Sequence, residues 1–105
     1  MDINYELYKV FYYVAVSLSF FDASKKLYIS QSAVSQSIKV LEKKLDQTLF
    51  IRSTKKVRLT PEGEILLRHI EPAVNLIRRG EAQIMETSTL GGGQIRIGAS
   101  DTICR

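Results

Sequence analysis

The sequence predicts a mainly α-helical chain, in which a three-helix domain with a small β-hairpin precedes one long helix. In residues 5–45, apolar residues recur at steps of three and four in three separate segments, which is the spacing of amphipathic helices. Two short β-prone runs follow, and helical spacing resumes at Pro61. We therefore expect a compact domain over residues 1–60, a long helix over 61–90, and a separate segment over 91–105.

The first helix is predicted over residues 5–17. Its core-facing positions are Leu7, Val10, Phe11, Val14, Ala15 and Leu18. Three tyrosines, Tyr5, Tyr8 and Tyr12, lie on a neighbouring stripe, and two interpretations remain open for them. They edge the core with their hydroxyls in water, as tyrosine commonly does, or they receive a second packing partner such as the long helix.

The next two helices are short and lie close together in the chain. Ser19 followed by Asp22 resembles a capping box, and Phe20, Ala23 and Leu27 then form one apolar stripe. After a turn of Tyr28 and Ile29, Ser30 is the expected N-cap of the third helix. Two short helices joined by such a turn form a helix-turn-helix unit, whose second helix enters the major groove of DNA.

The helix predicted over residues 30–45 has two distinct faces. Its core stripe consists of Val34, Ile38, Leu41 and Leu45, and its opposite face carries Ser32, Ser35, Gln36, Lys39 and Lys43 without an acidic residue. Gln and Ser can hydrogen-bond to base edges, and Lys neutralises phosphate. For an isolated helix, an ordinary solvated surface is the favoured interpretation. The preceding helix and turn favour DNA recognition instead.

A β-hairpin wing is predicted from residues 49–52 and 57–60, with its tip at 53–56. Its basic residues are Arg52, Lys55, Lys56 and Arg58. A β-ribbon beside a recognition helix is well placed to contact the DNA backbone or a minor groove, although basic hairpin tips also serve solubility. Residues 1–60 carry a net charge of +5 and residues 61–105 one of −1, within a total of +4. Positive charge is thus concentrated where phosphate contacts are expected.

The long helix should begin after Thr60 as its N-cap, with Pro61 at its first position and two glutamates in its first turns. A heptad-like stripe of Leu66, Ile70, Ala73, Ile77 and Ile84 predicts that this helix packs against a partner. Pro72 lies inside the helix, so we expect a bend near residues 68–72.

The segment from Ser19 to Glu64 resembles the N-terminal winged helix-turn-helix of LysR-type transcriptional regulators. The shared motifs are the serine-phenylalanine start, SQ-x-AVS, IK-x-LE-x-x-L, LF-x-R and LT-x-x-G. The resemblance is close over residues 5–65. It implies that the helix at 30–45 reads the major groove, that Gln31, Ser32, Ser35 and Gln36 lie near bases or backbone, and that Arg52 contacts DNA. With the residues chosen from their chemistry, the candidate DNA-binding set is Ser30, Gln31, Ser32, Ser35, Gln36, Lys39, Lys43, Arg52, Lys55, Lys56 and Arg58.

The same resemblance implies that the long helix is a linker helix that pairs in a homodimer. Residues 91–93 would be a hinge, and the strand expected at 94–99 would begin an effector-binding domain that this chain lacks. A small-molecule inducer would bind that missing domain, so no cofactor is expected here. A tetramer of full-length chains and a contact with RNA polymerase are left open.

Three positions depart from the family pattern. Ser32 stands where proline is frequent, Gln36 where arginine is frequent, and Asp46 where glycine is usual. Gln36 should shift base preference away from guanine contacts. Asp46 should adopt the left-handed conformation that ends a helix, at a cost of about 1 kcal/mol.

Other classes of function find little support in the residues. The single cysteine, Cys104, cannot form an internal disulfide, and no long apolar run or signal peptide is evident, so a soluble cytoplasmic protein without membrane association is expected. His69 has no partners at metal-ligand spacing, and no catalytic set is recognisable. The sequence therefore predicts a dimeric, sequence-specific DNA-binding regulator rather than an enzyme. Its alternatives are a winged-helix module that docks proteins and, more weakly, a basic amphipathic element on an anionic membrane.

Overall fold

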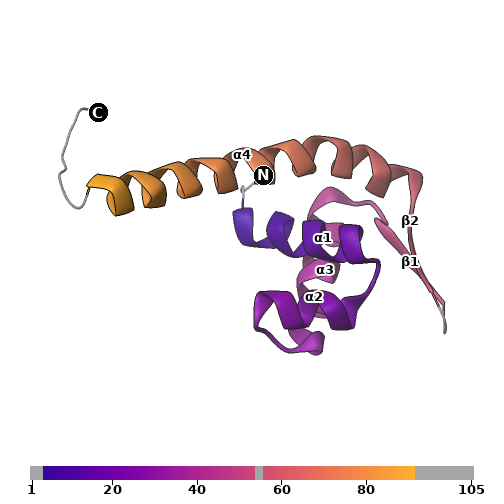
Figure 1. Cartoon of the computed structure of the whole chain (residues 1–105). Coiled ribbons are helices and arrows are strands. Elements are labelled where there is room, and N and C mark those ends of the chain that lie inside the picture. The colour runs from indigo at the N-terminus through magenta and orange to yellow at the C-terminus, as the bar shows by residue number, and fades with distance from the viewer. Residues whose placement is uncertain (1–3, 54–55, 92–105) are drawn as a thin grey trace. The chain divides into compact units, whose positions relative to one another are not determined.

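The computed structural model describes residues 4–53 and 56–91 (Figure 1). In chain order, these residues form α1 (Tyr5–Ser17), α2 (Phe20–Leu27), α3 (Gln31–Leu45), β1 (Phe50–Arg52), β2 (Val57–Leu59) and α4 (Pro61–Gly91). The predicted fold class, a mainly helical winged helix-turn-helix followed by a long helix, is confirmed. The predicted strand at 94–99 and Cys104 lie outside the described residues, as do residues 92–93 of the hinge expected at 91–93, whereas Gly91 is the last residue of α4.

The chain divides into two compact units, Met1–Val74 and Asn75–Arg105. The first unit contains α1, α2, α3, both strands and the first turns of α4. The second contains the remainder of α4. The predicted division of the chain at residues 60 and 90 stays a prediction.

The helix ends are fixed by local hydrogen bonds. The Ser19 hydroxyl accepts from the Asp22 amide at 3.0 Å, and the Ser30 hydroxyl accepts from the Ala33 amide at 3.1 Å, so both predicted N-caps are confirmed. Asp46 adopts the expected left-handed conformation, with φ 54° and ψ 43°. Leu18 and Tyr28 end α1 and α2 in the same left-handed conformation, with φ values of 51° and 60°. These two helix ends were not predicted from the sequence.

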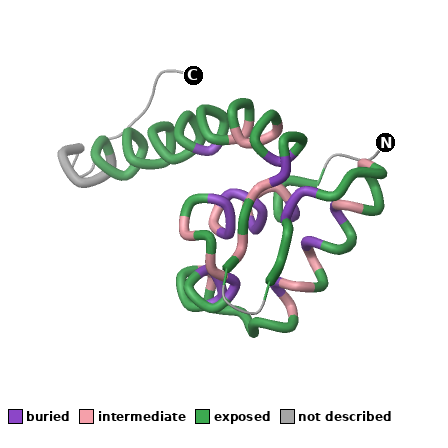
Figure 2. Tube along the Cα trace, turned by 90° about the vertical axis from the view of Figure 1, so that its right-hand side faces the viewer, coloured by how far each residue is buried: buried purple, intermediate pink, exposed green. Residues whose placement is uncertain are grey.

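Helices α1, α2 and α3 pack against one another around a single apolar core (Figure 2). Phe11, Val14, Val34, Leu41 and Leu49 are its largest fully buried side chains. The ring centroid of Phe50 lies 5.4 Å from that of Phe11 and 6.0 Å from that of Phe20, which anchors β1 to the helices. Because an isolated two-stranded ribbon is marginally stable, this anchor is needed to hold the wing in place.

The three tyrosines of α1 do not share one environment. Tyr12 is buried, Tyr8 is half-buried against the core, and Tyr5 is exposed. Tyr8 thus lies at the edge of the core, as the first of the two interpretations expects, whereas Tyr12 belongs to the interior.

The wing is an antiparallel ribbon in which Phe50 pairs with Leu59, Ile51 with Arg58, and Arg52 with Val57. Its tip is closed by Ser53, whose amide donates to the Lys56 carbonyl at 2.8 Å and whose hydroxyl accepts from the Lys56 amide at 3.1 Å. The strands predicted at 49–52 and 57–60 are each one residue shorter in the structure, because Leu49 and Thr60, at the end of the ribbon away from its tip, do not belong to them.

One buried threonine joins the wing to α4. The Thr60 hydroxyl donates to the Thr48 carbonyl at 2.6 Å and accepts from the Gly63 amide at 3.0 Å, which caps α4 as predicted. The Thr60 amide donates to the Leu49 carbonyl at 3.0 Å. The end of β2, the start of β1 and the first turn of α4 are thus tied together at one residue.

Part of the predicted dimerisation stripe packs inside the first unit. Leu66 and Ile70 are half-buried against the core, and their role in pairing two chains stays a prediction. Ala73, Ile77 and Ile84 are exposed, and Ile84 is 72% exposed. The helix continues across Pro72, and the bend expected there stays a prediction. Among the described residues, no helix is long and apolar enough to cross a membrane.

Candidate nucleic-acid interface

The outer face of α3 presents polar and basic side chains to solvent. Of the predicted residues on α3, Gln31, Ser32, Gln36, Lys39 and Lys43 are exposed and Ser35 is half-buried. Ser30 precedes the helix as its cap, and its hydroxyl lies 3.1 Å from that of Ser32, so these two hydroxyls also organise the helix start. The side-chain amides of this face belong to Gln31 and Gln36, and such groups are suited to hydrogen bonding with base edges.

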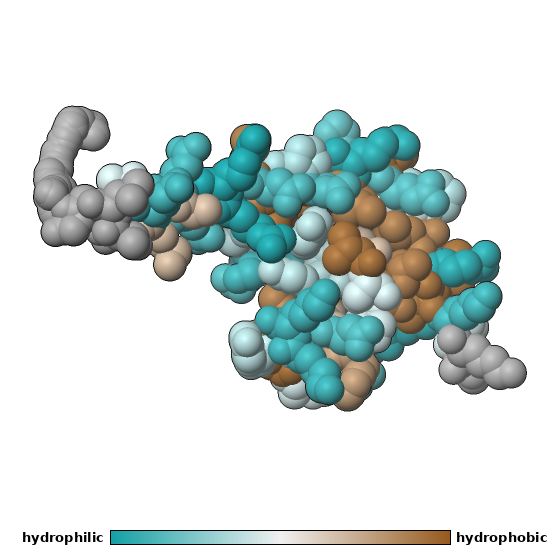
Figure 3. All heavy atoms as spheres, viewed as in Figure 1, coloured by the Kyte–Doolittle hydropathy of each residue, from teal (hydrophilic) through white to brown (hydrophobic). Residues whose placement is uncertain are grey.

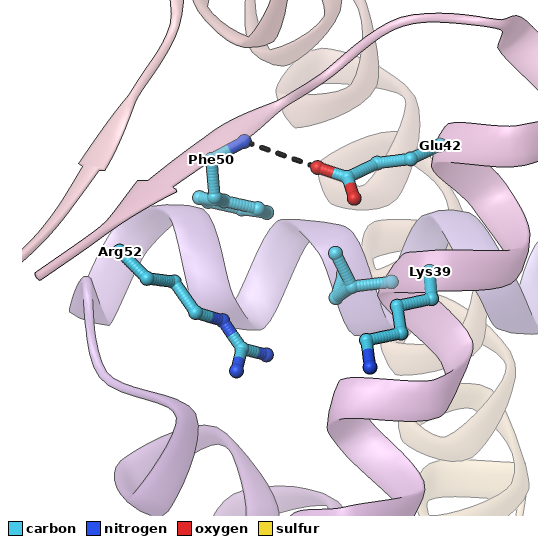
Figure 4. Close-up of a pocket in the computed structure, with 5 residues that line it drawn as sticks. Lys39, Glu42, Phe50 and Arg52 are labelled. Carbon is cyan, nitrogen blue, oxygen red and sulfur yellow. Dashed lines mark hydrogen bonds between the residues drawn. The ribbon is translucent and has the colours of Figure 1, made fainter.

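The acidic residue nearest this face, Glu42, is turned toward the wing. Its carboxylate accepts hydrogen bonds from the Leu49 amide at 2.8 Å and the Phe50 amide at 3.3 Å. Figure 4 shows the carboxylate directed at the backbone of β1. Its negative charge is therefore held by two backbone donors and is directed away from the outer face.

Between α3 and β1 lies a hollow of about 240 Å³, lined by Ile38, Lys39, Glu42, Phe50 and Arg52. In Figure 4 the Lys39 ammonium and the Arg52 guanidinium extend to the same side of this hollow. Two cations from separate elements are thereby brought together, an arrangement that attracts an anionic backbone.

Arg52 contacts both helices of the helix-turn-helix. Its Nη2 donates to the Ser35 hydroxyl at 2.6 Å, and its Cζ lies 3.8 Å from the ring centroid of Phe20. Alternation along β1 explains this placement, because Arg52 shares a face with the buried Phe50 while Ile51 faces outward. Two predicted DNA-binding residues, Ser35 and Arg52, are therefore direct partners.

The remaining candidates are spread more widely. Arg58 and Lys56 are exposed on the wing, and Arg58 lies across from Ile51 on its outer face. Lys43 lies at the far end of α3, where it lines a second hollow together with Asp46. Lys55 falls outside the described residues. The structure thus groups Ser35 and Lys39 with Arg52, whereas Lys43 and Arg58 lie elsewhere.

A different surface of the first unit carries exposed apolar side chains. Figure 3 shows an apolar area over the C-terminal part of α1 and the adjoining strands. Val16 and Ile51, which belong to these elements, are 46% and 44% exposed. Among the described residues of α3, by contrast, Val40 is the one large apolar side chain that is exposed, at 39%. The polar and basic surface is thus the distinguishing feature of α3.

Two residues of this site were not chosen from the sequence. Phe20 was assigned to the core stripe alone, yet its ring also supports Arg52. Glu42 was placed beside the reading face without a role, and its hydrogen bonds run to residues seven and eight positions later. The one available signal was the presence of an acid within the IK-x-LE-x-x-L motif.

Replacing Glu42 should weaken the junction between α3 and the wing. In Glu42→Ala, two backbone amides of buried residues lose their acceptor, and we expect the free energy of unfolding to fall by about 2 kcal/mol. Glu42→Gln keeps one oxygen acceptor and should lose less. Urea unfolding measures both, with exposed Glu81→Ala as the control. Equal stability of Glu42→Ala and Glu81→Ala would contradict a structural role for this carboxylate.

Comparison with known proteins identifies the family of this domain. The family model described as "Bacterial regulatory helix-turn-helix protein, lysR family" matches residues 5–64, which contain every element from α1 to β2. The chain belongs to the lysR family. Its members are DNA-binding transcription regulators rather than enzymes. Separately, the described ranges contain no group of residues able to hold a metal ion.

Individual relatives agree with this assignment. The chain is 40% identical over 84 residues to a probable RuBisCO transcriptional regulator of Emiliania huxleyi, covering 80% of this chain and 27% of that protein. Oxidized OxyR of Corynebacterium glutamicum superposes with a TM-score of 0.74 at 31% identity, over 80% of this chain and 27% of that one. BenM_DBD in its complex with catB site 1 DNA superposes with a TM-score of 0.67 at 26% identity, over 89% and 100% of the two chains. This lysR-family chain thus spans about 27% of the length of its Emiliania huxleyi relative.

Proposed function

We propose that this lysR-family chain binds double-stranded operator DNA in a sequence-specific manner and so regulates transcription. The observation that supports this most directly is the outer face of α3. Exposed amide and hydroxyl groups occupy its N-terminal half, Lys39 and Lys43 follow, and the carboxylate of Glu42 is directed away. Such a surface can read bases and neutralise phosphate without repelling the DNA.

In this proposal, α3 and the wing have different tasks. The N-terminal part of α3, with Gln31, Ser35 and Gln36, reads base edges in the major groove. The wing, with Arg52, Lys56 and Arg58 and with Lys55 of the tip predicted from the sequence, lies on the backbone or a minor groove. The likeness to BenM_DBD, whose structure is a DNA complex, supports DNA binding by this domain.

We also propose that two chains pair through α4. The exposed Ala73, Ile77 and Ile84 are the part of the heptad stripe that is left for a second helix. A pair of domains would bind two half-sites, which favours a palindromic operator. Binding of an inducer to a further domain, tetramer formation, contact with RNA polymerase and a cytoplasmic location remain predictions for the whole protein.

The proposed function can be tested without knowing the operator. Selection of bound sites from random duplex DNA yields the operator sequence and the spacing of its half-sites. We expect the selected duplex to bind at least about 10³ times more tightly than a scrambled duplex of the same composition. Its affinity should also fall steeply as salt rises from 50 to 200 mM, by about 10³-fold or more for six phosphate contacts.

Two results would argue against this function. Equal affinity for selected and scrambled duplexes would support a module that docks proteins and uses its basic surface for non-specific attraction. A weak dependence of affinity on salt would mean that the cations of α3 and the wing do not lie on phosphates.

A further inference from the structure

One side chain links three elements of the candidate interface. Arg52 leaves β1, donates through Nη2 to the Ser35 hydroxyl of α3 at 2.6 Å, and lies with Cζ 3.8 Å from the ring centroid of Phe20 in α2. Phe20 is itself buried and packs against Phe50, the anchor of the wing. The guanidinium therefore rests on a fixed support.

The chemistry of this contact depends on arginine. A guanidinium is planar, so it can stack on an aromatic ring and donate in its own plane at the same time. A lysine ammonium has the same charge but neither the plane nor the fork. The contact is therefore more than a placement of positive charge near α3.

The contact also changes what Ser35 can offer. A free serine hydroxyl can either donate or accept, so it discriminates poorly between bases. Here the Ser35 oxygen already accepts from a cation, which disfavours a second donor at the same oxygen. Its hydroxyl hydrogen is left for donation, and no hydrogen bond from it to a carbonyl is found within residues 4–53 and 56–91.

We propose that Arg52 is a positioning residue that makes Ser35 a hydrogen-bond donor toward DNA and so sets base preference at one operator position. Guanine N7 and O6, adenine N7 and thymine O4 are acceptors in the major groove, whereas the cytosine amino group is a donor. Ser35 should therefore disfavour cytosine on the strand that it faces. This inference rests on the proposed function, and it assigns Arg52 a task beyond a phosphate contact.

The contact can first be measured in the free protein. Stacking on Phe20 should move the Arg52 side-chain protons upfield in NMR spectra, and Phe20→Leu should abolish that shift. Ser35→Ala should speed solvent exchange of the Arg52 Nη protons. Arg58, exposed on the outer face of the wing, provides the reference resonance. Unshifted Arg52 protons would overturn the inference, whatever the protein does with DNA.

The role in recognition is then tested on the selected operator. Arg52→Lys keeps the charge, so the salt dependence should stay as in the wild type. Both Arg52→Lys and Ser35→Ala should lose about tenfold discrimination at the same base pair. The double variant should lose no more than either single variant, because both changes remove one shared interaction. Arg68→Lys, at an exposed arginine of α4 outside the candidate DNA-binding set, is the matched control and should preserve the preference. Thermal unfolding confirms that each variant is folded.

The outcomes separate the two proposals. Wild-type preference in Arg52→Lys, or losses at different base pairs that add in the double variant, would overturn the positioning role while leaving the proposed function intact. If the wild type does not discriminate between the selected operator and a scrambled duplex, both the proposed function and the role assigned to Ser35 are overturned. In that case a shifted Arg52 resonance would identify a contact that serves the fold alone.

Discussion

Gly63→Ala should destabilise the domain by about 3 kcal/mol, although alanine is ordinarily the better helix residue. A Cβ at Gly63 would overlap the backbone carbonyl oxygen of Leu49 and lie 2.8 Å from Cδ2 of Leu59. A flexible side chain can move aside, but the Leu49 carbonyl is held because it accepts from the Thr60 amide at 3.0 Å. The added methyl therefore has to push α4 away from the base of the wing.

The same helix contains the matched control. Gly80 has nothing within 4 Å of the position that its Cβ would take, so Gly80→Ala should gain about 0.5–1 kcal/mol of helix stability. Urea and thermal unfolding followed by circular dichroism measure both variants. We expect the same glycine-to-alanine change to lower the free energy of unfolding at Gly63 and to raise it at Gly80. A Gly63→Ala protein as stable as the wild type would show that the corner has room to move.

Charges on the exposed part of the α4 stripe should abolish the proposed dimer. Ile77 and Ile84 are 42% and 72% exposed, so Ile77→Glu with Ile84→Glu should leave the first unit folded. Burying these carboxylates between two helices would be costly, so the double variant should sediment as a monomer. Operator affinity should then fall by about 10² or more, because two linked half-site contacts become one.

The choice of positions follows from the packing of α4. Leu66 and Ile70 lie on the same stripe but pack against the core, so charges there would unfold the domain as well as separate the chains. The control is Asn75→Glu with Ala82→Glu, which adds two carboxylates at the same seven-residue spacing on the opposite side of the helix. A dimer that survives the stripe variant, or one that is lost in the control, would mean that another surface pairs the chains.

Local features of this domain could be predicted from the sequence because they depend on near neighbours. The caps at Ser19, Ser30 and Thr60 bond to amides three residues later, and the left-handed Asp46 follows from its place at a helix end. Helix faces follow from the 3.6-residue period, so Val34, Ile38 and Leu41 were correctly assigned to the core.

Contacts between distant segments could not be predicted in the same way. Arg52 and Ser35 are seventeen residues apart in the sequence. Neither the hydrophobic periodicity nor the charge pattern indicates that this wing residue contacts α3 at Ser35. For the same reason, the sequence assigned Leu66 and Ile70 to the stripe for a partner helix, whereas tertiary packing buries part of both. The candidate site was therefore found as a set of residues on two elements, and its internal connections came from the structure.

The corner at Thr60 restricts which side chain can cap α4. At most helix starts, serine, threonine, aspartate and asparagine are nearly interchangeable, because only an acceptor for a helix amide is required. Here the capping atom also donates, at 2.6 Å, to the Thr48 carbonyl. A carboxylate has no hydrogen to give, so aspartate would place two oxygens in mutual repulsion at the foot of the ribbon. The β-hydroxy residues satisfy both demands with a single atom, which accounts chemically for threonine in the LT-x-x-G motif.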